Sequence, residues 1–485
     1  MTEPTIYELS SPGRNGVRFP EADVPITQLP EGLVREVLPL PELSELDVVR
    51  HFMHLSAFNY NIDSGFYPLG SCTMKYNPKI NEETASLPGF AFTHPLQPAE
   101  TVQGNLALMY QLQNWLKEIS GFAAVSLQPS AGAQGEFTGV MIIRAYHQAR
   151  GDVKRTKMII PDSAHGTNPA KSAMSGMEVL PIPTDKDGNI DLNAFKNLCG
   201  DEIAGLMITN PNTLGLFDQH ILEVVKAVHN CGGLVYGDGA NLNALLGICR
   251  PGDLGFDVMH FNLHKTFSTP HGGGGPGSGP VGVAEHLKDF LPGPMVTITE
   301  EGSEDVPPLY GWYMPSKSIG RVKSFAGQFG MMVRAYTYIS MHGADGLRRI
   351  SEYAVLNANY LLARLRSTYK VPFDRTCMHE FVMEGKWEDS PVRALDISKR
   401  LMDYKFHPPT NYFPLIVHEA LMIEPTETES KQTLDEFADA LIKIAEEAHT
   451  QPELLQQAPH ITPVGRLDEV KTARELVLCC SIPDL

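Results

Sequence analysis

Long apolar runs, paired cysteines and an excess of basic residues are all missing from this chain of 485 residues. Without a run of about 18 apolar residues, the sequence predicts no transmembrane helix. The seven cysteines are scattered and form no CxxC pair, which is typical of reduced thiols in a cytoplasmic protein and not of a disulfide framework or a metal site. The N-terminus lacks the blocks of a signal or transit peptide. We therefore expect a cytoplasmic protein without a membrane anchor.

The charge balance is acidic, with 57 Asp and Glu against 39 Lys and Arg and a formal net charge of -18. Such a surface disfavours broad electrostatic binding to nucleic acid or to anionic membranes. A local basic pocket for one phosphate group is still compatible with this composition. With 42% apolar and 20% charged residues, the chain is expected to fold as a globule of two to three domains.

Short apolar runs alternate with helical patterns in the middle of the chain. The helical patterns cover residues 99–120, about 136–150 and 219–230, and the strand-like runs cover residues 123–127, 156–160, 203–209, 234–237 and 258–261. This alternation predicts an α/β domain with a mostly parallel sheet that is covered on both faces. In such sheets ligands bind beyond the carboxyl ends of the strands, so the residues that follow each run are the candidate site.

The rest of the chain predicts two further parts. Residues 1–95 have little periodicity before residue 43, which indicates an N-terminal arm and a loop segment, and residues 96–335 form the large domain. Residues 336–485 predict a smaller α+β domain, with a long helical stretch to about residue 369, strands at 378–383 and 412–423, and helices at 392–404 and 430–448.

Lys265 follows the apolar run 257–263 and precedes a glycine-rich stretch, residues 271–280. A lysine at the junction of strand and loop is well placed to hold an aldehyde cofactor as a Schiff base, because its unprotonated amine is a nucleophile. Pyridoxal phosphate is the first such cofactor to consider. A lone lysine beside a flexible loop is, however, more often an ordinary surface residue.

A carboxylate ends the neighbouring run. Asp238 lies at the end of the strand-like run 234–237, and Ala240, two residues later, is small enough to let a flat ring lie against the strand end. The Asp238 carboxylate could pair with the pyridinium nitrogen of the cofactor and keep it protonated. The alternative is a helix cap or a turn, which is the usual role of an aspartate in this position.

Four more polar residues follow the strand-like runs. His165 could stack on a pyridine ring and transfer protons near neutral pH. Thr209 offers a hydroxyl to the ring or the phosphate, and Asn262 and His264 flank the lysine. Each is also common as a satisfied loop residue without any function.

A small-residue turn joins the run 123–127 to the next helical pattern. A strand, such a turn and a helix direct backbone N–H groups and the helix dipole at a phosphate, although the same arrangement also serves as a plain connection. A basic segment at residues 313–323 is proposed to meet a phosphate or a partner's site, with a solvated helix start as the alternative. The turn residues expected to contact the cofactor are Ser130, Ala131, Gly132, Ala133 and Gln134.

In chain order, these features resemble the large domain of the aspartate-aminotransferase-like superfamily of pyridoxal-phosphate enzymes, known as fold type I. Longer motifs carry a closer resemblance, to the second subunit of the split glycine cleavage system P-protein, glycine dehydrogenase (decarboxylating). It extends over about residues 60–430. The motifs are FYPLGSCTMKYNP at 66–78, QPSAGAQG at 128–135, HGTNP at 165–169, NLHKTF at 262–267 and ALMIEPTETES at 420–430.

The resemblance implies an enzyme that uses pyridoxal phosphate to decarboxylate glycine and passes the aminomethyl group to the lipoyl arm of an H-protein. It implies that Lys265 holds the cofactor and carries protons, and that His165 stacks on the ring and assists proton transfer. It also implies a companion first subunit, in a heterotetramer with two chains of each type.

Two alternatives stay open at this point. One is a different fold-type-I reaction that needs no lipoyl carrier. The other is a non-catalytic half of the complex, which is disfavoured because Lys265 is present.

Overall fold

The structure is a computed structural model of the full chain, and it describes residues 3–30, 32–34, 38, 40–270 and 277–477. Contacts divide the chain into two compact units. Residues 66–456 form one unit, and residues 1–65 together with 457–485 form the other. The predicted division at residues 95 and 335 stays a prediction.

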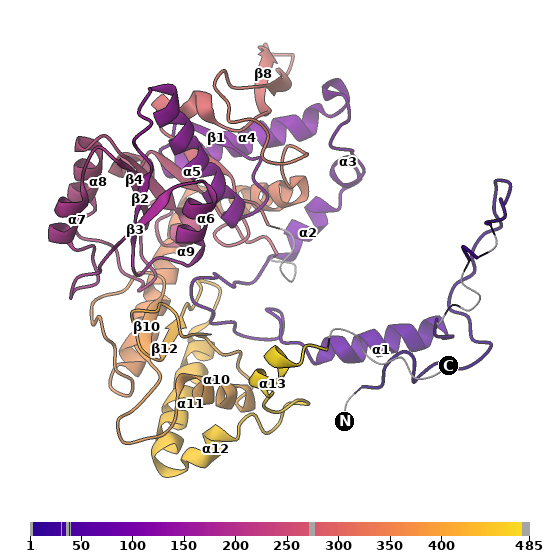
Figure 1. Ribbon diagram of the computed structural model, residues 1–485. Helices are drawn as coiled ribbons and strands as arrows, with labels where there is room; N and C mark the ends of the chain where they lie inside the picture. The colour runs from indigo at the N-terminus through magenta and orange to yellow at the C-terminus, as the bar shows by residue number, and fades with distance from the viewer. Residues whose placement is uncertain (1–2, 31, 35–37, 39, 271–276, 478–485) are drawn as a thin grey trace. The chain divides into compact units, whose positions relative to one another are not determined.

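A seven-stranded sheet forms the centre of the larger unit (Figure 1), in the order β1-β7-β6-β5-β4-β2-β3. Strands β2 to β6 pair in parallel, whereas β7 runs antiparallel to both of its neighbours. The predicted, mostly parallel sheet is thus confirmed. The strands are β1 (Ala124–Ser126), β2 (Lys157–Pro161), β3 (Glu178–Ile182), β4 (Ile203–Thr209), β5 (Leu234–Asp238), β6 (Val258–His260) and β7 (Val281–Val283).

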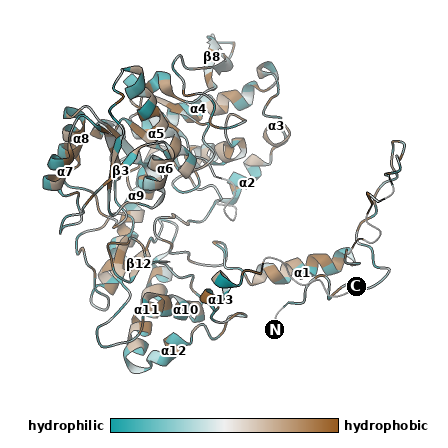
Figure 2. Ribbon diagram, in the orientation of Figure 1, coloured by the Kyte–Doolittle hydropathy of each residue, from teal (hydrophilic) through white to brown (hydrophobic). Residues whose placement is uncertain are grey.

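Helices with one apolar face cover the sheet. In α8, the residues Ile221, Val224, Val225 and Val228 recur at helical spacing and are all buried. Figure 2 shows the corresponding alternation of hydrophobic and hydrophilic residues along α8 and α11. The predicted helix at 99–120 is also confirmed. The helical elements of this part are α2 (Lys79–Ala85), α3 (Pro88–Ala91), η1 (Ala99–Thr101), α4 (Gln103–Ser120), α5 (Gly132–Ala149), α6 (Thr167–Met174), α7 (Leu192–Leu198), α8 (Ile221–Asn230), η2 (Gly239–Ala244), η3 (Pro251–Leu254) and η4 (Glu285–Phe290).

The C-terminal part of this unit is built on a three-stranded antiparallel sheet in the order β10-β12-β11. Our prediction of one strand over residues 412–423 is wrong, because Tyr412 and Glu419 have left-handed φ angles of 59° and 52° that interrupt an extended chain. The hairpin of β8 (Met295–Glu300) and β9 (Leu309–Tyr313) was not predicted. The remaining elements of this unit are α9 (Phe329–Leu365), β10 (Phe381–Glu384), α10 (Ala394–Asp403), β11 (Thr410–Asn411), β12 (Ala420–Ile423), α11 (Lys431–Thr450) and α12 (Pro452–Gln456).

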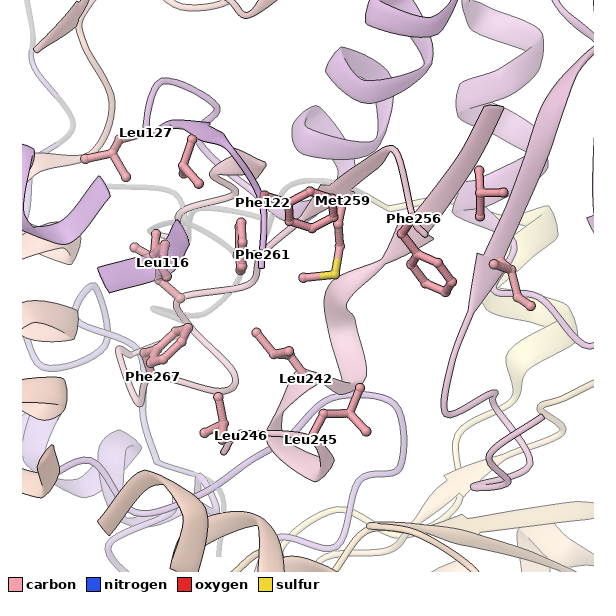
Figure 3. Close-up of a cluster of buried hydrophobic side chains, with 14 of the residues drawn as sticks. Leu116, Phe122, Leu127, Leu242, Leu245, Leu246, Phe256, Met259, Phe261 and Phe267 are labelled. Atoms are coloured by element: carbon pink, nitrogen blue, oxygen red, sulfur yellow. The ribbon is translucent and has the colours of Figure 1, made fainter. Parts of the chain in front are cut away.

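The main apolar core lies between α4, the sheet and the first half of α9. Phe261 and Phe267 are fully buried in it, among Leu116, Leu242 and Leu246 (Figure 3). These two rings lie on either side of Lys265 in sequence, so burial fixes both ends of the short loop that carries the lysine.

The smaller unit contains α1 (Glu45–Ala57) and α13 (Glu469–Arg474). Helix α1 begins at a capping box, in which the Ser44 hydroxyl accepts from the Asp47 N–H and the Asp47 carboxylate accepts from the backbone of Ser44. Many apolar side chains of this unit are exposed, including Phe19 and Ile26. Within the described ranges, no helix of either unit has the length and apolar character needed to cross a bilayer.

Candidate active site

A cavity of about 250 Å³ opens beyond the carboxyl ends of the parallel strands. Thr209 and Asp238 are the last residues of β4 and β5, and His165 and Lys265 follow β2 and β6. Parallel strands bring their carboxyl ends to one edge of the sheet, so four residues that are far apart in sequence line one cavity.

Ten of the twelve predicted site residues line this cavity. The other two, Ser130 and Gln134, are not among its lining residues and bond to each other instead. The Ser130 N–H and hydroxyl donate to Gln134 Oε1 at 2.7 and 2.8 Å, and Gln134 Nε2 donates to the Val322 carbonyl at 2.5 Å. The ten are Ala131, Gly132, Ala133, His165, Thr209, Asp238, Ala240, Asn262, His264 and Lys265.

The Gln134 bond also places the basic segment 313–323 beside the small-residue turn. Val322 lies in this segment, and its N–H donates to Gln128 Oε1 at 2.6 Å. After the end of β9 the segment is loop, so the alternative of a helix start is wrong. Its role toward a phosphate or a partner stays a prediction.

Lys265 extends its amine into the cavity, where Nζ donates to the backbone carbonyl of Ser71 at 2.7 Å. On the following residue, the Thr266 carbonyl accepts a hydrogen bond from Lys75 Nζ at 2.8 Å. Residues 271–276 of the predicted glycine-rich stretch lie outside the described residues. Beyond them, the Ser278 N–H donates to His264 Nδ1 at 3.3 Å.

Asp238 is buried at the floor of the cavity with several donors around it. Its Oδ1 accepts from the Ala240 N–H at 2.9 Å and its Oδ2 from Asn168 Nδ2 at 3.0 Å, and His260 Nε2 lies 3.5 Å from Oδ1. Burial alone would raise the pKa of Asp238, but His260, Asn168, the Ala240 N–H and Lys265 outweigh it, so the pKa is lowered. Asp238 therefore carries its negative charge at neutral pH.

Glu136 is a second carboxyl group in this cavity, and it shares Asn168 with Asp238. Asn168 Nδ2 lies 3.2 Å from Glu136 Oε2 and donates to it as well. Burial, followed by repulsion from Asp238, raises the pKa of Glu136 to about 7. Of the two neighbouring carboxyls, Asp238 is thus the anion, and Glu136 holds a proton over part of the neutral range.

His165 is connected to Glu136 through one threonine. The Thr167 hydroxyl donates to Glu136 Oε1 at 3.0 Å and lies 2.8 Å from His165 Nδ1, and the Thr167 N–H donates to the same ring nitrogen at 3.2 Å. Burial lowers the pKa of His165, which favours the neutral ring. Since Nδ1 accepts from the backbone, the proton of this neutral ring belongs on Nε2.

Two further observations test whether a ring with polar substituents fits here. Thr209 Oγ1 is buried at the cavity and has no hydrogen-bond partner among the described residues, so a ligand group could satisfy it. Gly132 begins α5, and a Cβ at this position would overlap the Asn262 side-chain oxygen. Because α5 begins here, the backbone N–H groups of Gly132 and Ala133 lie at a helix N-terminus, which favours an anion. The donor set fits a pyridine ring with a phosphate.

A metal ion fits these residues less well than a pyridine ring with a phosphate does. Ligand atoms of Glu136, Asp238 and His260 lie within 4.8 Å of one another. Asn168 already bonds both carboxylates, and Asn262 Nδ2 lies 3.0 Å from His260 Nε2. Hydrogen bonds therefore account for this group.

Known proteins are similar to this chain over almost its whole length. It is 60% identical over 479 residues to the "Probable glycine dehydrogenase (decarboxylating) subunit 2" of Caldanaerobacter subterraneus subsp. tengcongensis, a match that covers 98% of both chains. Proteins of the same name from Desulforamulus reducens and Halalkalibacterium halodurans are each 57% identical and cover 98% of this chain and 98% and 97% of their own. The chain belongs to the family of glycine dehydrogenase (decarboxylating) subunit 2.

Residues 350–460 of this chain also match the family model for the glycine dehydrogenase C-terminal domain. A solved glycine decarboxylase (P-protein) of the glycine cleavage system superposes with a TM-score of 0.73 at 20% identity, over 86% of this chain and 93% of that chain. A glutamate decarboxylase from Lactobacillus brevis gives 0.64 at 14% identity, over 88% and 96%. These likenesses show the fold, which is the predicted aspartate-aminotransferase-like fold type I.

The sequence did not predict several residues that line this cavity. Ser71, Glu136, Thr167 and His260 all line it. Glu136 had a usable signal, because it is an acidic residue two positions after the small-residue turn, near the start of a predicted helix. Ser71 had only its place in the motif at 66–78, which gives no spatial neighbour.

Proposed function

We propose that this chain decarboxylates glycine with pyridoxal phosphate and passes the remaining aminomethyl group to the lipoyl arm of an H-protein. In the overall change the bond between glycine Cα and its carboxyl carbon breaks and CO₂ leaves. A bond from Cα to one lipoyl sulfur forms as the lipoyl S–S bond breaks, and the other sulfur takes up a proton. The observation that carries the proposal is one cavity that holds both the Lys265 amine and the ionised Asp238.

The cofactor supplies an electron-accepting ring on which negative charge at the glycine Cα can be delocalised. Lys265 would hold it as a Schiff base. The ionised Asp238 would face the ring nitrogen, and its bonds from Asn168 and the Ala240 N–H fix the direction of the carboxylate. The N-terminus of α5 would receive the phosphate.

The chain's own groups also hold the protons that the reaction must move. Neutral His165 carries a proton on Nε2, and its Nδ1 is fixed by Thr167. Thr167 in turn connects to Glu136, which retains a proton near pH 7. This chain of groups supports a role for His165 in holding the ring and in transferring a proton.

The name of the relatives, subunit 2, supports a companion subunit 1, and we propose two chains of each type together with a lipoylated H-protein as the acceptor. The cytoplasm is the proposed location. It is supported by five cysteines that form no disulfide among the described residues, namely Cys72, Cys199, Cys231, Cys249 and Cys377.

The proposal is tested with this chain, a subunit 1, a lipoylated H-protein, glycine and labelled bicarbonate. Label should enter the glycine carboxyl group, and Lys265→Ala should abolish both the exchange and the yellow imine absorbance of the purified protein. Lys117→Ala on α4, which is not among the residues that line the cavity, is a control that should change neither. If the wild-type protein is yellow but exchanges no label, the glycine reaction is refuted while the cofactor is retained. Unchanged absorbance in Lys265→Ala would refute the cofactor assignment.

A further inference from the structure

The motif at residues 66–78 has no part in the function proposed above, yet it lies directly against the Lys265 loop. Ser71 O accepts from Lys265 Nζ at 2.7 Å, and Lys75 Nζ donates to the Thr266 carbonyl at 2.8 Å. Farther along, the Ser268 hydroxyl donates to the Tyr76 carbonyl at 3.0 Å. The segment Ser71–Lys75 therefore contacts the lysine and the backbone of its loop.

The opposite side of this segment is held by acidic residues of the C-terminal part of the same unit. The Ser71 N–H donates to Glu380 Oε2 at 2.7 Å, and the Thr73 hydroxyl donates to Glu424 Oε1 at 2.6 Å. Lys75 Nζ donates to Glu427 Oε1 at 2.8 Å. Alternate residues of the segment thus each meet one carboxyl group, and two of the three carboxyls belong to the motif at 420–430.

Ser71 is the member of this segment that needs support. Its φ angle is 65°, in the left-handed region that side chains other than glycine rarely adopt. In this conformation its carbonyl meets the Lys265 amine while its N–H meets Glu380. A fully buried acceptor therefore holds the sterically unfavourable residue whose carbonyl receives the lysine.

The buried cluster of residues next to Ser71 is suited to keep Glu380 in a fixed position. His379, Glu380 and Glu424 are each fully buried, and their ligand atoms lie within 4.8 Å of one another. Burial, then the neighbouring Glu424, raises the pKa of Glu380 well above its usual range. A protonated Glu380 carries no charge that would draw water into the group.

We infer that Glu380 is a positioning residue that fixes Ser71, so that the Ser71 carbonyl holds the Lys265 amine whenever that amine is not bonded to the cofactor. This inference rests on the function proposed above, in which glycine must displace the lysine amine. The displaced amine needs an acceptor close by, and a fixed carbonyl stabilises the displaced state more than a mobile loop would.

The test measures the displacement itself. The holoenzyme complex with subunit 1 is titrated with glycine in the absence of H-protein, and the change of the yellow imine absorbance gives an apparent Kd. Glu380→Ala frees Ser71, so the apparent Kd should rise roughly tenfold, as for the loss of the hydrogen bond between the Ser71 carbonyl and the Lys265 amine. Glu380→Gln keeps an oxygen for the Ser71 N–H and should stay within a factor of about three of wild type.

A second perturbation leaves the acid group intact. Ser71→Val disfavours the left-handed conformation because valine is branched at Cβ, and it should raise the apparent Kd in the same direction as Glu380→Ala. Glu447→Ala is the matched control. This buried glutamate of the same part bonds Arg400 and Tyr404 and touches no residue of the segment, so the apparent Kd should not change.

The inference is overturned if Glu380→Ala and Ser71→Val bind glycine as wild type does. It is also overturned if Glu380→Gln raises the apparent Kd as much as Glu380→Ala does. The acid proton, and not the oxygen that accepts from the Ser71 N–H, would then be the important feature. Suppose that the wild-type complex is yellow and exchanges label, and that the variants show no change in the apparent Kd. That result refutes this inference and leaves the proposed function intact. A wild-type complex that lacks the imine absorbance refutes the proposed cofactor.

Discussion

Replacing Lys75 by methionine should destabilise the larger unit strongly. The ammonium group is buried and donates to three acceptors, namely the Thr266 carbonyl at 2.8 Å, the Tyr338 hydroxyl at 3.0 Å and Glu427 Oε1 at 2.8 Å. All three of its protons are therefore used. Burial would lower the pKa of Lys75, but Glu427 and Tyr338 outweigh it and raise the pKa, so the charge persists throughout the neutral range.

Methionine matches the length of the lysine stem but leaves the Glu427 carboxylate buried without its cation. Removing one partner of a buried ion pair costs about 3–5 kcal/mol, much of it from the charge that stays behind. In urea unfolding followed by tryptophan fluorescence, the midpoint should fall by roughly 1 M or more. Lys443→Met is the control, because Lys443 pairs with Glu446 on the surface, and the midpoint should not move.

The double variant Lys75→Met/Glu427→Leu separates charge from packing. Replacing both partners by apolar residues removes the stranded carboxylate, so most of the lost stability should return. If the single variant unfolds at the wild-type midpoint, the pair is not a stabilising feature. Simple addition of the two single effects in the double variant would show that the residues are not coupled, which would contradict the 2.8 Å contact.

Three other outcomes follow from the cavity. Gly132→Ala should weaken cofactor binding, measured by titrating the imine absorbance, because its Cβ would displace Asn262, whereas Gly104→Ala in open space should have no effect. Asp238→Asn should keep the imine absorbance but lower the rate of label exchange on the order of a hundredfold. Burial raises the pKa of Glu136 to about 7, so its contribution to stability is complete below about pH 4.3 and is lost as the pH rises through 7. Glu136→Gln should therefore flatten the decline in the free energy of unfolding between pH 5 and 8, and an unchanged slope would contradict the assigned pKa.

The place of the candidate site at one edge of the sheet could be predicted from sequence because it depends on local signals and one rule of topology. Thr209, Asp238 and Lys265 each follow a short apolar run, and the rule that parallel strands end at one edge places them together. No long-range contact had to be known. The alternation of strands and helices was likewise sufficient to predict the fold class, because it is also a local signal.

Weak strands escaped prediction for physical reasons. Strand β3 contains Pro181 and is half-exposed at the edge of the sheet, so it has neither the apolar run nor the regular alternation of a strand. Strand β7 contains Gly282 and directly follows the glycine-rich stretch 271–280, whose composition indicates a loop. Residues 412–423 have strand-like composition, but left-handed angles at Tyr412 and Glu419 divide them, and such angles have no reliable signal outside glycine.

The supporting residues of the site could not be predicted because they depend on contacts between distant parts of the chain. Burial of Glu136, followed by repulsion from Asp238 about a hundred positions later, raises its pKa. Ser71 meets Lys265 across 194 positions and Glu380 across 309. Sequence patterns within one element do not encode such pairs.

The alternating contacts of the segment Ser71–Lys75 also set a rule for exchanging parts between relatives. A chimera that takes its C-terminal part from another member of the family would set foreign residues opposite Ser71, Thr73 and Lys75. The segment and the motif at 420–430 should therefore be transplanted together. In an alignment of the family, substitutions at Lys75 and Glu427 should covary, so that one seldom changes without the other.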